Sequence, residues 1–366
     1  MFNGRRLSIA RRRRAMGKTT LATLIGVTSN TLLRYENGEI GAPPQENIAK
    51  LAEVLDFPEE FFAGPDIDEP RRDNASFRGM ASKSGKIMDA ALASGAIAYL
   101  LDDWIGNQFS RPDPHLIDLQ HEKPEVAAGL LRQVWRLGDK PIKNMVHLLE
   151  ANGVRVFSLS ENTKEVDAFS LWRDDVPYIF LNRFKSAERS RFDAAHELAH
   201  LCLHKHGGAA SIYKSSDLER EANSFAGSFL MPASDVRAIC RNPIYGVNDL
   251  LDYKKRWGVS VSAYNYRAHE LGLISDARSA SNYVEMSRRG WLKQEPLGLP
   301  REQSSILQDV MMDLVGRGIT KTKIAADIGV PPTEIEGLLF GLANMLTIDG
   351  AGGSTPRREV ALRIIK

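Results

Sequence analysis

Apolar side chains recur at helical spacing through the N-terminal part of the chain. Residues 5–15 have helical character, and "GKTTLATLIGV" predicts a short helix that ends at Gly26. Thr28 or Ser29 can cap the following helix, "NTLLRYENG", which ends at Gly38. Helices over "QENIAKLAEVLDF" and "PEEFF" come next. Two short helices joined by a tight turn, with more helices around them, are typical of a helix-turn-helix.

The middle of the chain changes from helical to strand patterns. The polar, proline-bearing residues 65–75 predict a linker, and helical stretches follow at about 84–108 and 124–138. "PIKNMVHLLEANGVRVFSL" predicts an amphipathic helix, a turn and a strand, and "DAFSLW" and "YIFLN" predict two more strands. A small sheet that leads into a long helix indicates an α+β domain. We interpret "YIFLN" as a sheet edge that could pair with an extended peptide.

The segment "RFDAAHELAHLCLHKH" is rich in histidine. At about 100° per residue on a helix, His196 and His200 share one face with Glu197 beside them, whereas His206 lies on another face. This H-E-x-x-H spacing suits one metal ion held by two imidazoles, with the glutamate as general base toward a zinc-activated water. The apolar neighbours disfavour a surface helix with unrelated histidines, because buried imidazoles and carboxylates need partners.

A catalytic zinc needs a third protein ligand. In "SSDLEREANSFAGSFLMP", Glu219 and Glu221 are about 200° apart around a helix, so they cannot both face one ion. Asp217 is a further option. His206 has the spacing of the third ligand in another class of zinc peptidases, but Leu203 stands where those proteins have a glycine that turns the chain. Spacing alone leaves the choice between the two glutamates open.

Composition and charge narrow the class of protein. The chain has 366 residues, a net charge of +2 and two cysteines, Cys202 and Cys240. Two cysteines cannot form a disulfide framework, and no apolar run approaches the roughly 18 residues of a membrane span, so we expect a cytoplasmic protein without membrane contact. Residues 1–40 hold eight basic and two acidic side chains. This local excess predicts an anionic polymer as the partner of that end.

The stretch "LATLIGVTSNTLLRYENG" resembles the Cro/repressor-type (XRE) helix-turn-helix family, although Lys18 stands where many members have glutamine. The resemblance implies binding to double-stranded operator DNA, with residues 28–36 as the recognition helix in the major groove. It also implies that arginines of the first helix approach phosphates. The implied DNA-contacting residues are Lys18, Ser29, Asn30, Thr31 and Arg34, together with Arg11, Arg12, Arg13 and Arg14.

"RFDAAHELAHLCLH" and "EREANSFAGSFLMP", with the preceding "GVRVF", "DAFS" and "PYIFLN", resemble the ImmA/IrrE family of metallopeptidases. The resemblance implies that His196, His200 and Glu221 bind Zn²⁺ and that Glu197 is the catalytic base, as in gluzincins. It gives His204 no role as a ligand, so His204 either orients the substrate or lies beside the site. The implied activity is proteolysis of a regulatory protein such as a repressor or an antitoxin.

"TKIAADIGVPPTEIEGLLFG" echoes the first motif near the C-terminus. Its second helix offers Glu334 and Glu336 and no basic residue, so it should repel phosphate and instead serve packing or protein contact. We therefore predict a mostly helical α+β chain in four parts. These are a helix-turn-helix domain (1–64), a linker and helical connector (65–140), a gluzincin-like zinc metallopeptidase domain (141–275), and a helical C-terminal region with a degenerate helix-turn-helix and a flexible tail (276–366).

Two functions of different classes fit this organisation. The first is a DNA-binding zinc endopeptidase that cleaves a regulatory protein. The second is a transcriptional regulator or antitoxin whose metallopeptidase-like domain is a non-catalytic sensor or dimerisation module. Glu197 favours the first, because a purely structural site needs no base. A homodimer on a palindromic operator is compatible with such a DNA-binding module.

Overall fold

A computed structural model describes residues 2–71, 85–159, 165–204, 215–240, 243–343 and 363–364. The chain forms two compact units. The first comprises Met1–Pro112, Phe157–Asp167 and Ser304–Lys366, and the second comprises Asp113–Val156 and Ala168–Gln303. The fold is the predicted mostly helical α+β type. Within the described residues, none of the helices combines the length and apolar character that crossing a bilayer requires.

The first unit begins with a helical cluster around a small apolar core. Gly26, at φ 76°, ends the second helix, and Val27 N–H donates to the Ala22 carbonyl at 2.9 Å across the turn. The Thr28 hydroxyl caps the third helix by accepting from Thr31 N–H. These contacts confirm the predicted helix-turn-helix geometry. The elements are α1 (Gly4–Arg13), α2 (Lys18–Ile25), α3 (Ser29–Glu36), α4 (Gln45–Leu55) and the 3-10 helix η1 (Glu59–Ala63).

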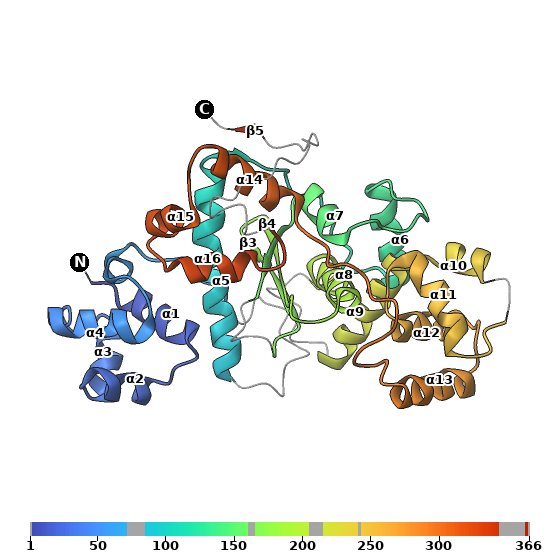
Figure 1. Cartoon of the computed structure of the whole chain (residues 1–366), viewed down its shortest axis with the longest axis horizontal. Coiled ribbons are helices and arrows are strands. Elements are labelled where there is room, and N and C mark those ends of the chain that lie inside the picture. Colours follow the sequence, from blue (N-terminus) through green and yellow to red (C-terminus); the bar gives the residue numbers. More distant parts are fainter. Residues whose placement is uncertain are drawn as a thin grey trace. The chain divides into compact units, whose positions relative to one another are not determined.

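The long helix α5 (Gly85–Gly106) contacts α1 and also the C-terminal helices α15 (Lys321–Ile328) and α16 (Pro332–Leu339) (Figure 1). The α15–α16 pair repeats the backbone of α2–α3. Gly329 has φ 73°, and Val330 N–H donates to the Ala325 carbonyl at 2.9 Å. The unit also contains α14 (Ser305–Gly316) and the antiparallel strand pair β1 (Phe109–Ser110) and β5 (Arg363–Ile364).

The second unit places one long helix against a small sheet. Helix α8 (Ala187–Leu203) contacts strands β3 (Ala168–Arg173) and β4 (Val176–Leu181) as well as helix α9 (Ser215–Leu230). Around this centre lie α6 (Pro124–Val134), α7 (Met145–Ala151), α10 (Ala233–Ile239), α11 (Val247–Trp257), α12 (Val261–Glu270) and α13 (Asp276–Arg288). Because α13 belongs to this unit, the C-terminal region is divided between the two units.

The sheet has the order β2-β4-β3, with β2 at Arg155–Ser158. Strands β3 and β4 are antiparallel and join through a tight turn, in which Asp174 adopts φ 51°. The interpretation of "YIFLN" as a sheet edge is wrong, because β4 pairs on both sides. Among the described strands of this sheet, β3 is the edge that also contacts α8. The sequence could not show this, because both strands are apolar and largely buried.

Candidate metal centre and DNA-binding face

Helix α8 carries the H-E-x-x-H residues, as the periodicity predicts. The Ser186 hydroxyl caps its start by accepting from Arg189 N–H, and His204 stands at the C-cap. The exposed fraction of the side chain is 15% for His196 and 1% for His200, so both imidazoles need polar partners inside the fold. His206, which the sequence places on a different face of the helix, lies outside the described residues.

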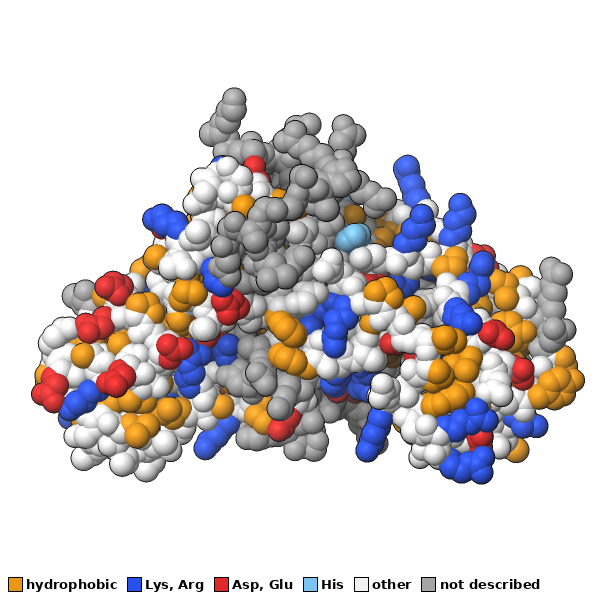
Figure 2. Space-filling model, in the orientation of Figure 1, with side chains coloured by type: hydrophobic (Ala, Val, Ile, Leu, Met, Phe, Trp, Pro, Cys, Tyr) orange, Lys and Arg blue, Asp and Glu red, His pale blue; other side chains and the backbone are white. Residues whose placement is uncertain are grey.

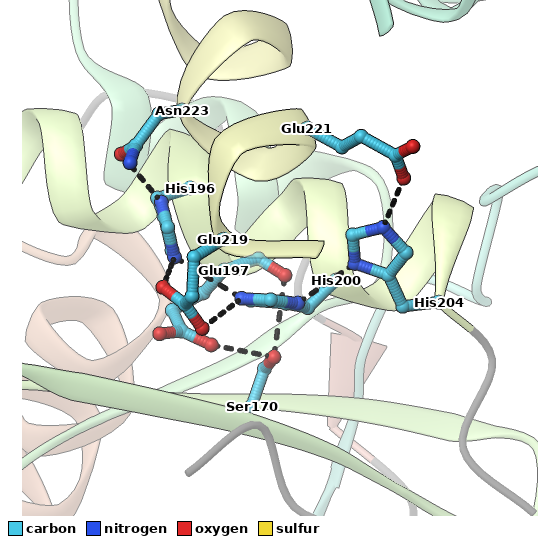
Figure 3. Close-up of polar contacts among 8 residues, drawn as sticks. All are labelled: Ser170, His196, Glu197, His200, His204, Glu219, Glu221 and Asn223. Carbon is cyan, nitrogen blue, oxygen red and sulfur yellow. Dashed lines mark hydrogen bonds and ion pairs between the residues drawn. The ribbon is translucent and has the colours of Figure 1, made fainter. Parts of the chain in front are cut away.

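The two imidazoles and one carboxylate converge on a common point (Figure 3). His196 Nε2 and His200 Nε2 are 3.1 Å apart. Glu219 Oε2 lies 3.3 Å from His196 Nε2, and Glu219 Oε1 lies 3.6 Å from His200 Nε2. Two imidazole nitrogens on one tetrahedral Zn²⁺ are about 3.3 Å apart, since each Zn–N bond is about 2.0–2.1 Å. The spacing therefore fits a single ion.

Glu219 supplies a second sign that an ion belongs here. Its Oε1 is buried and has no hydrogen-bond partner among the described residues. A buried carboxylate oxygen without a hydrogen bond is costly, and a bound cation removes that cost. His196, His200 and Glu219 therefore form a candidate metal site with the donor types that zinc prefers.

The third donor differs from the predicted one. The structure places Glu219 beside the two histidines, whereas Glu221 Oε2 lies 3.1 Å from His204 Nε2. The two glutamates point in different directions because two positions on a helix span about 200°. The Glu221 side chain is 44% exposed, against 23% for Glu219. Their spacing on the helix shows that Glu219 and Glu221 cannot both bind one ion. It does not determine which of the two faces α8.

Asn223 orients one of the two imidazoles. Its Oδ1 lies 3.0 Å from His196 Nδ1 and accepts the proton there, which leaves the Nε2 lone pair for a metal. Asn223 was missed in the sequence. The available signal was its position one helical turn after Glu219, on the same face of α9.

Ser170 holds the carboxylate of Glu197 in place. Its hydroxyl donates to Glu197 Oε2 at 2.7 Å and lies 3.2 Å from the Glu197 carbonyl. Ser170 is fully buried in β3, and Glu197 is only 4% exposed. The sequence signal for Ser170 was a lone hydroxyl in the apolar strand "DAFSLW", since a buried hydroxyl needs a partner.

The electrostatic surroundings of the site suit a cation. Burial would lower the pKa of His196, but the hydrogen bond with Glu219 and the charges of Glu197, Glu219 and Asp193 outweigh burial and raise that pKa. The carboxylates that favour a protonated imidazole also favour a bound metal ion. A cluster of this kind in a partly enclosed place is typical of a functional site.

The predicted DNA-reading residues lie in the helix-turn-helix of the first unit. Ser29, Asn30 and Arg34 are exposed on α3, and Lys18 is exposed at the start of α2. The Thr31 hydroxyl shares a hydrogen bond of 2.9 Å with the Thr28 hydroxyl at the cap. On the face shown in Figure 2, the N-terminal helices carry both acidic and basic side chains and no continuous basic patch.

The arginine run of α1 differs from the prediction of phosphate contact. Arg11 forms a two-pronged ion pair with Glu36, with Nε–Oε1 at 2.6 Å and Nη2–Oε2 at 3.1 Å. Arg13 Nε lies 2.7 Å from Glu334 Oε2. Arg11 and Arg13 are 7% and 4% exposed, so neither guanidinium is available to a phosphate. Their partners lie far along the sequence, which is why the run alone indicated a DNA contact.

The other two arginines of the run are also paired within the first unit. Arg12 donates to Glu69, and Arg14 donates to Glu334 and to Asp56. Both guanidinium groups are about one-fifth exposed. Among the side chains that the sequence predicted to contact DNA, the exposed cations are therefore Lys18 and Arg34 rather than the arginine run.

Two known families match the two parts of the chain that carry these residues. Residues 9–62 match the helix-turn-helix family model, and residues 149–269 match the peptidase family model described as the IrrE N-terminal-like domain. A search of curated proteins finds no significant match. The fold and the site together define a class of protein: a helix-turn-helix protein with a metallopeptidase-like centre. The chain combines an XRE-type helix-turn-helix domain with an IrrE N-terminal-like domain of the M78 peptidases.

Proposed function

We propose that the protein is a zinc-dependent endopeptidase that also binds double-stranded operator DNA. The observation that carries the proposal is the convergence of His196, His200 and Glu219, with the Glu197 carboxylate held beside them by Ser170. A site kept only for structure would be complete with its metal ligands. The additional oriented carboxylate supports hydrolysis.

Several residues of the chain have separate roles in the proposed peptide hydrolysis. A bound zinc ion supplies positive charge that polarises the substrate carbonyl and lowers the pKa of water. Glu197 accepts the proton of the attacking water and can return it to the departing amine. Ser170 holds one oxygen of Glu197 and thereby sets the direction of the other. Edge strand β3 lies against α8 and can pair with an extended substrate chain.

The fusion of the two domains supports a proposal for the substrate class. A DNA-binding module raises the local concentration of the peptidase near proteins that occupy the same DNA. We therefore propose a DNA-associated regulatory protein, such as a repressor or an antitoxin, as the substrate.

The proposal is tested by comparing cellular protein N-termini in cells that make the natural protein or Glu197→Gln. We expect new termini only with the natural protein, because the substitution removes the base and leaves the metal ligands and the helix-turn-helix intact. Identical termini under several stresses, with both forms still binding zinc and one operator, would instead support a regulator with a non-catalytic metal domain.

Binding to DNA gives a separate prediction. On an operator selected by the natural protein from random duplexes, Arg34→Ala should cost about 1–3 kcal/mol of binding free energy, as for loss of a base contact. Lys18→Ala should lower the salt slope by about one. Fluorescence anisotropy at several salt concentrations measures both effects. Lys50→Ala is the matched control, because the Lys50 side chain on α4 is 43% exposed and pairs with Glu46. Equal losses in all three variants would contradict the assignment.

A further inference from the structure

The two metal-facing imidazoles have different partners on their far sides (Figure 3). His196 Nδ1 meets the neutral amide of Asn223. His200 Nδ1 instead lies 2.9 Å from His204 Nδ1, and His204 Nε2 lies 3.1 Å from Glu221 Oε2. A chain of hydrogen bonds therefore runs from His200, whose side chain is 1% exposed, to a carboxylate that is 44% exposed.

The chemistry of imidazole fixes the direction of this chain. A neutral imidazole has one N–H and one lone pair. To offer the Nε2 lone pair to a metal, His200 must carry its proton on Nδ1 and donate it to His204 Nδ1. His204 must then carry its own proton on Nε2 and donate it to Glu221, because an ionised carboxylate only accepts.

The reverse direction is incompatible with metal binding. If His204 Nδ1 donated to His200 Nδ1, the proton of His200 would sit on Nε2, which lies 3.1 Å from His196 Nε2. That proton would occupy the point where the two imidazoles converge. The Glu221 carboxylate therefore selects, through His204, the tautomer of His200 that can bind an ion.

We propose, on the basis of the zinc site assigned above, that His204 and Glu221 are positioning residues for the metal ligand His200. Neither residue needs to touch the ion, because both act by fixing the proton and the ring orientation of His200. Partners of this kind typically change metal affinity by roughly 10–100-fold. The proposal gives Glu221 a role at the site other than that of a ligand.

The test measures zinc affinity by competition with a chromogenic chelator and records the visible spectrum of the Co²⁺-loaded full chain. His204→Phe keeps a ring and removes both nitrogens, so zinc should bind roughly 10–100-fold more weakly and the Co²⁺ bands should shift. His204→Asn places an amide oxygen at the position of His204 Nδ1, where it can accept from His200 Nδ1, as Asn223 does for His196. It should recover much of the affinity, with circular dichroism verifying the fold of each variant.

Glu221→Gln provides a variant at a side chain that is partly exposed and easily tolerated. It should weaken zinc binding several-fold in the natural background and leave affinity unchanged in the His204→Phe background, since it acts only through His204. Asp217→Asn makes the same charge change on α9, away from the hydrogen-bond chain, and should have little effect.

Equal losses from Glu221→Gln in both backgrounds, or natural affinity in His204→Phe, would overturn the proposal. These measurements do not depend on proteolysis. Zinc binding with the expected affinity ratios but no cleavage would contradict the proposed function and still support the positioning role. Natural zinc affinity in His204→Phe with cleavage intact would overturn the positioning role and still support the proposed function.

Discussion

Substituting Glu219 with alanine is expected to weaken zinc binding by roughly 100-fold or more. Zinc sites built from protein ligands bind with apparent free energies of about 10–16 kcal/mol, so the loss of one ligand in three removes several kcal/mol. Glu219 is the carboxylate within 3.3 Å of His196 Nε2 and 3.6 Å of His200 Nε2. Chelator competition, with zinc content verified by elemental analysis, measures the effect.

Glu221→Ala is the matched control for this prediction. Both substitutions remove one carboxylate from α9, but Glu221 contacts His204 rather than the two ligand imidazoles. Its loss should weaken zinc binding at least tenfold less than the loss of Glu219, in line with an indirect partner. A larger loss from Glu221→Ala than from Glu219→Ala would show that the third ligand has been assigned to the wrong glutamate.

Glu334→Gln is expected to lower the free energy of unfolding of the first unit by about 3 kcal/mol or more. Glu334 is 1% exposed and accepts from both Arg13 and Arg14. Removing its charge breaks the buried ion pair with Arg13 on one side, and breaking a buried pair in this way typically costs about 3–5 kcal/mol. Urea denaturation followed by circular dichroism measures the change.

Glu336 on the same helix provides the control. It pairs with Lys321 at 2.8 Å, but its side chain is 44% exposed. Exposed ion pairs contribute about 0–1 kcal/mol, so Glu336→Gln should change stability by less than about 1 kcal/mol. Equal effects of the two substitutions would contradict the structural role assigned to Glu334.

The position of Glu334 distinguishes the C-terminal helix pair α15–α16 from the similar pair α2–α3. Aligning Gly26 with Gly329 and Val27 with Val330 places Glu334 where α3 has Thr31, a residue predicted to face DNA. In the C-terminal copy this position is acidic, buried and paired with arginines of α1. The α15–α16 pair therefore has the backbone geometry of α2–α3, while this position of its second helix pairs with arginines of the same chain.

Local patterns in the sequence predicted the parts of the fold that depend on local physics. The α2–α3 turn follows from Gly26 and the Thr28 cap, and the pairing of His196 with His200 follows from four-residue spacing on a helix. The choice of Glu219 depends on how α9 is rotated against α8. That rotation is set by tertiary packing, which the spacing of residues does not determine.

Contacts between distant residues account for the remaining differences. Ser170 and Glu197 are 27 positions apart, and Arg13 and Glu334 are 321 apart. A run of four arginines shows its charge in the sequence but not its counter-ions. The sequence therefore indicated DNA contact for side chains that the fold uses in internal ion pairs.

The most direct test of the metal centre is anomalous X-ray scattering at the zinc edge from crystals of the zinc-loaded full chain. We expect one anomalous peak bound by His196 Nε2, His200 Nε2 and the Glu219 carboxylate, with Glu197 beside it. We also expect Glu221 to lie against His204, away from the ion. A peak ligated by Glu221 or His204, or the lack of any peak at the paired histidines, would contradict this assignment of the ligands.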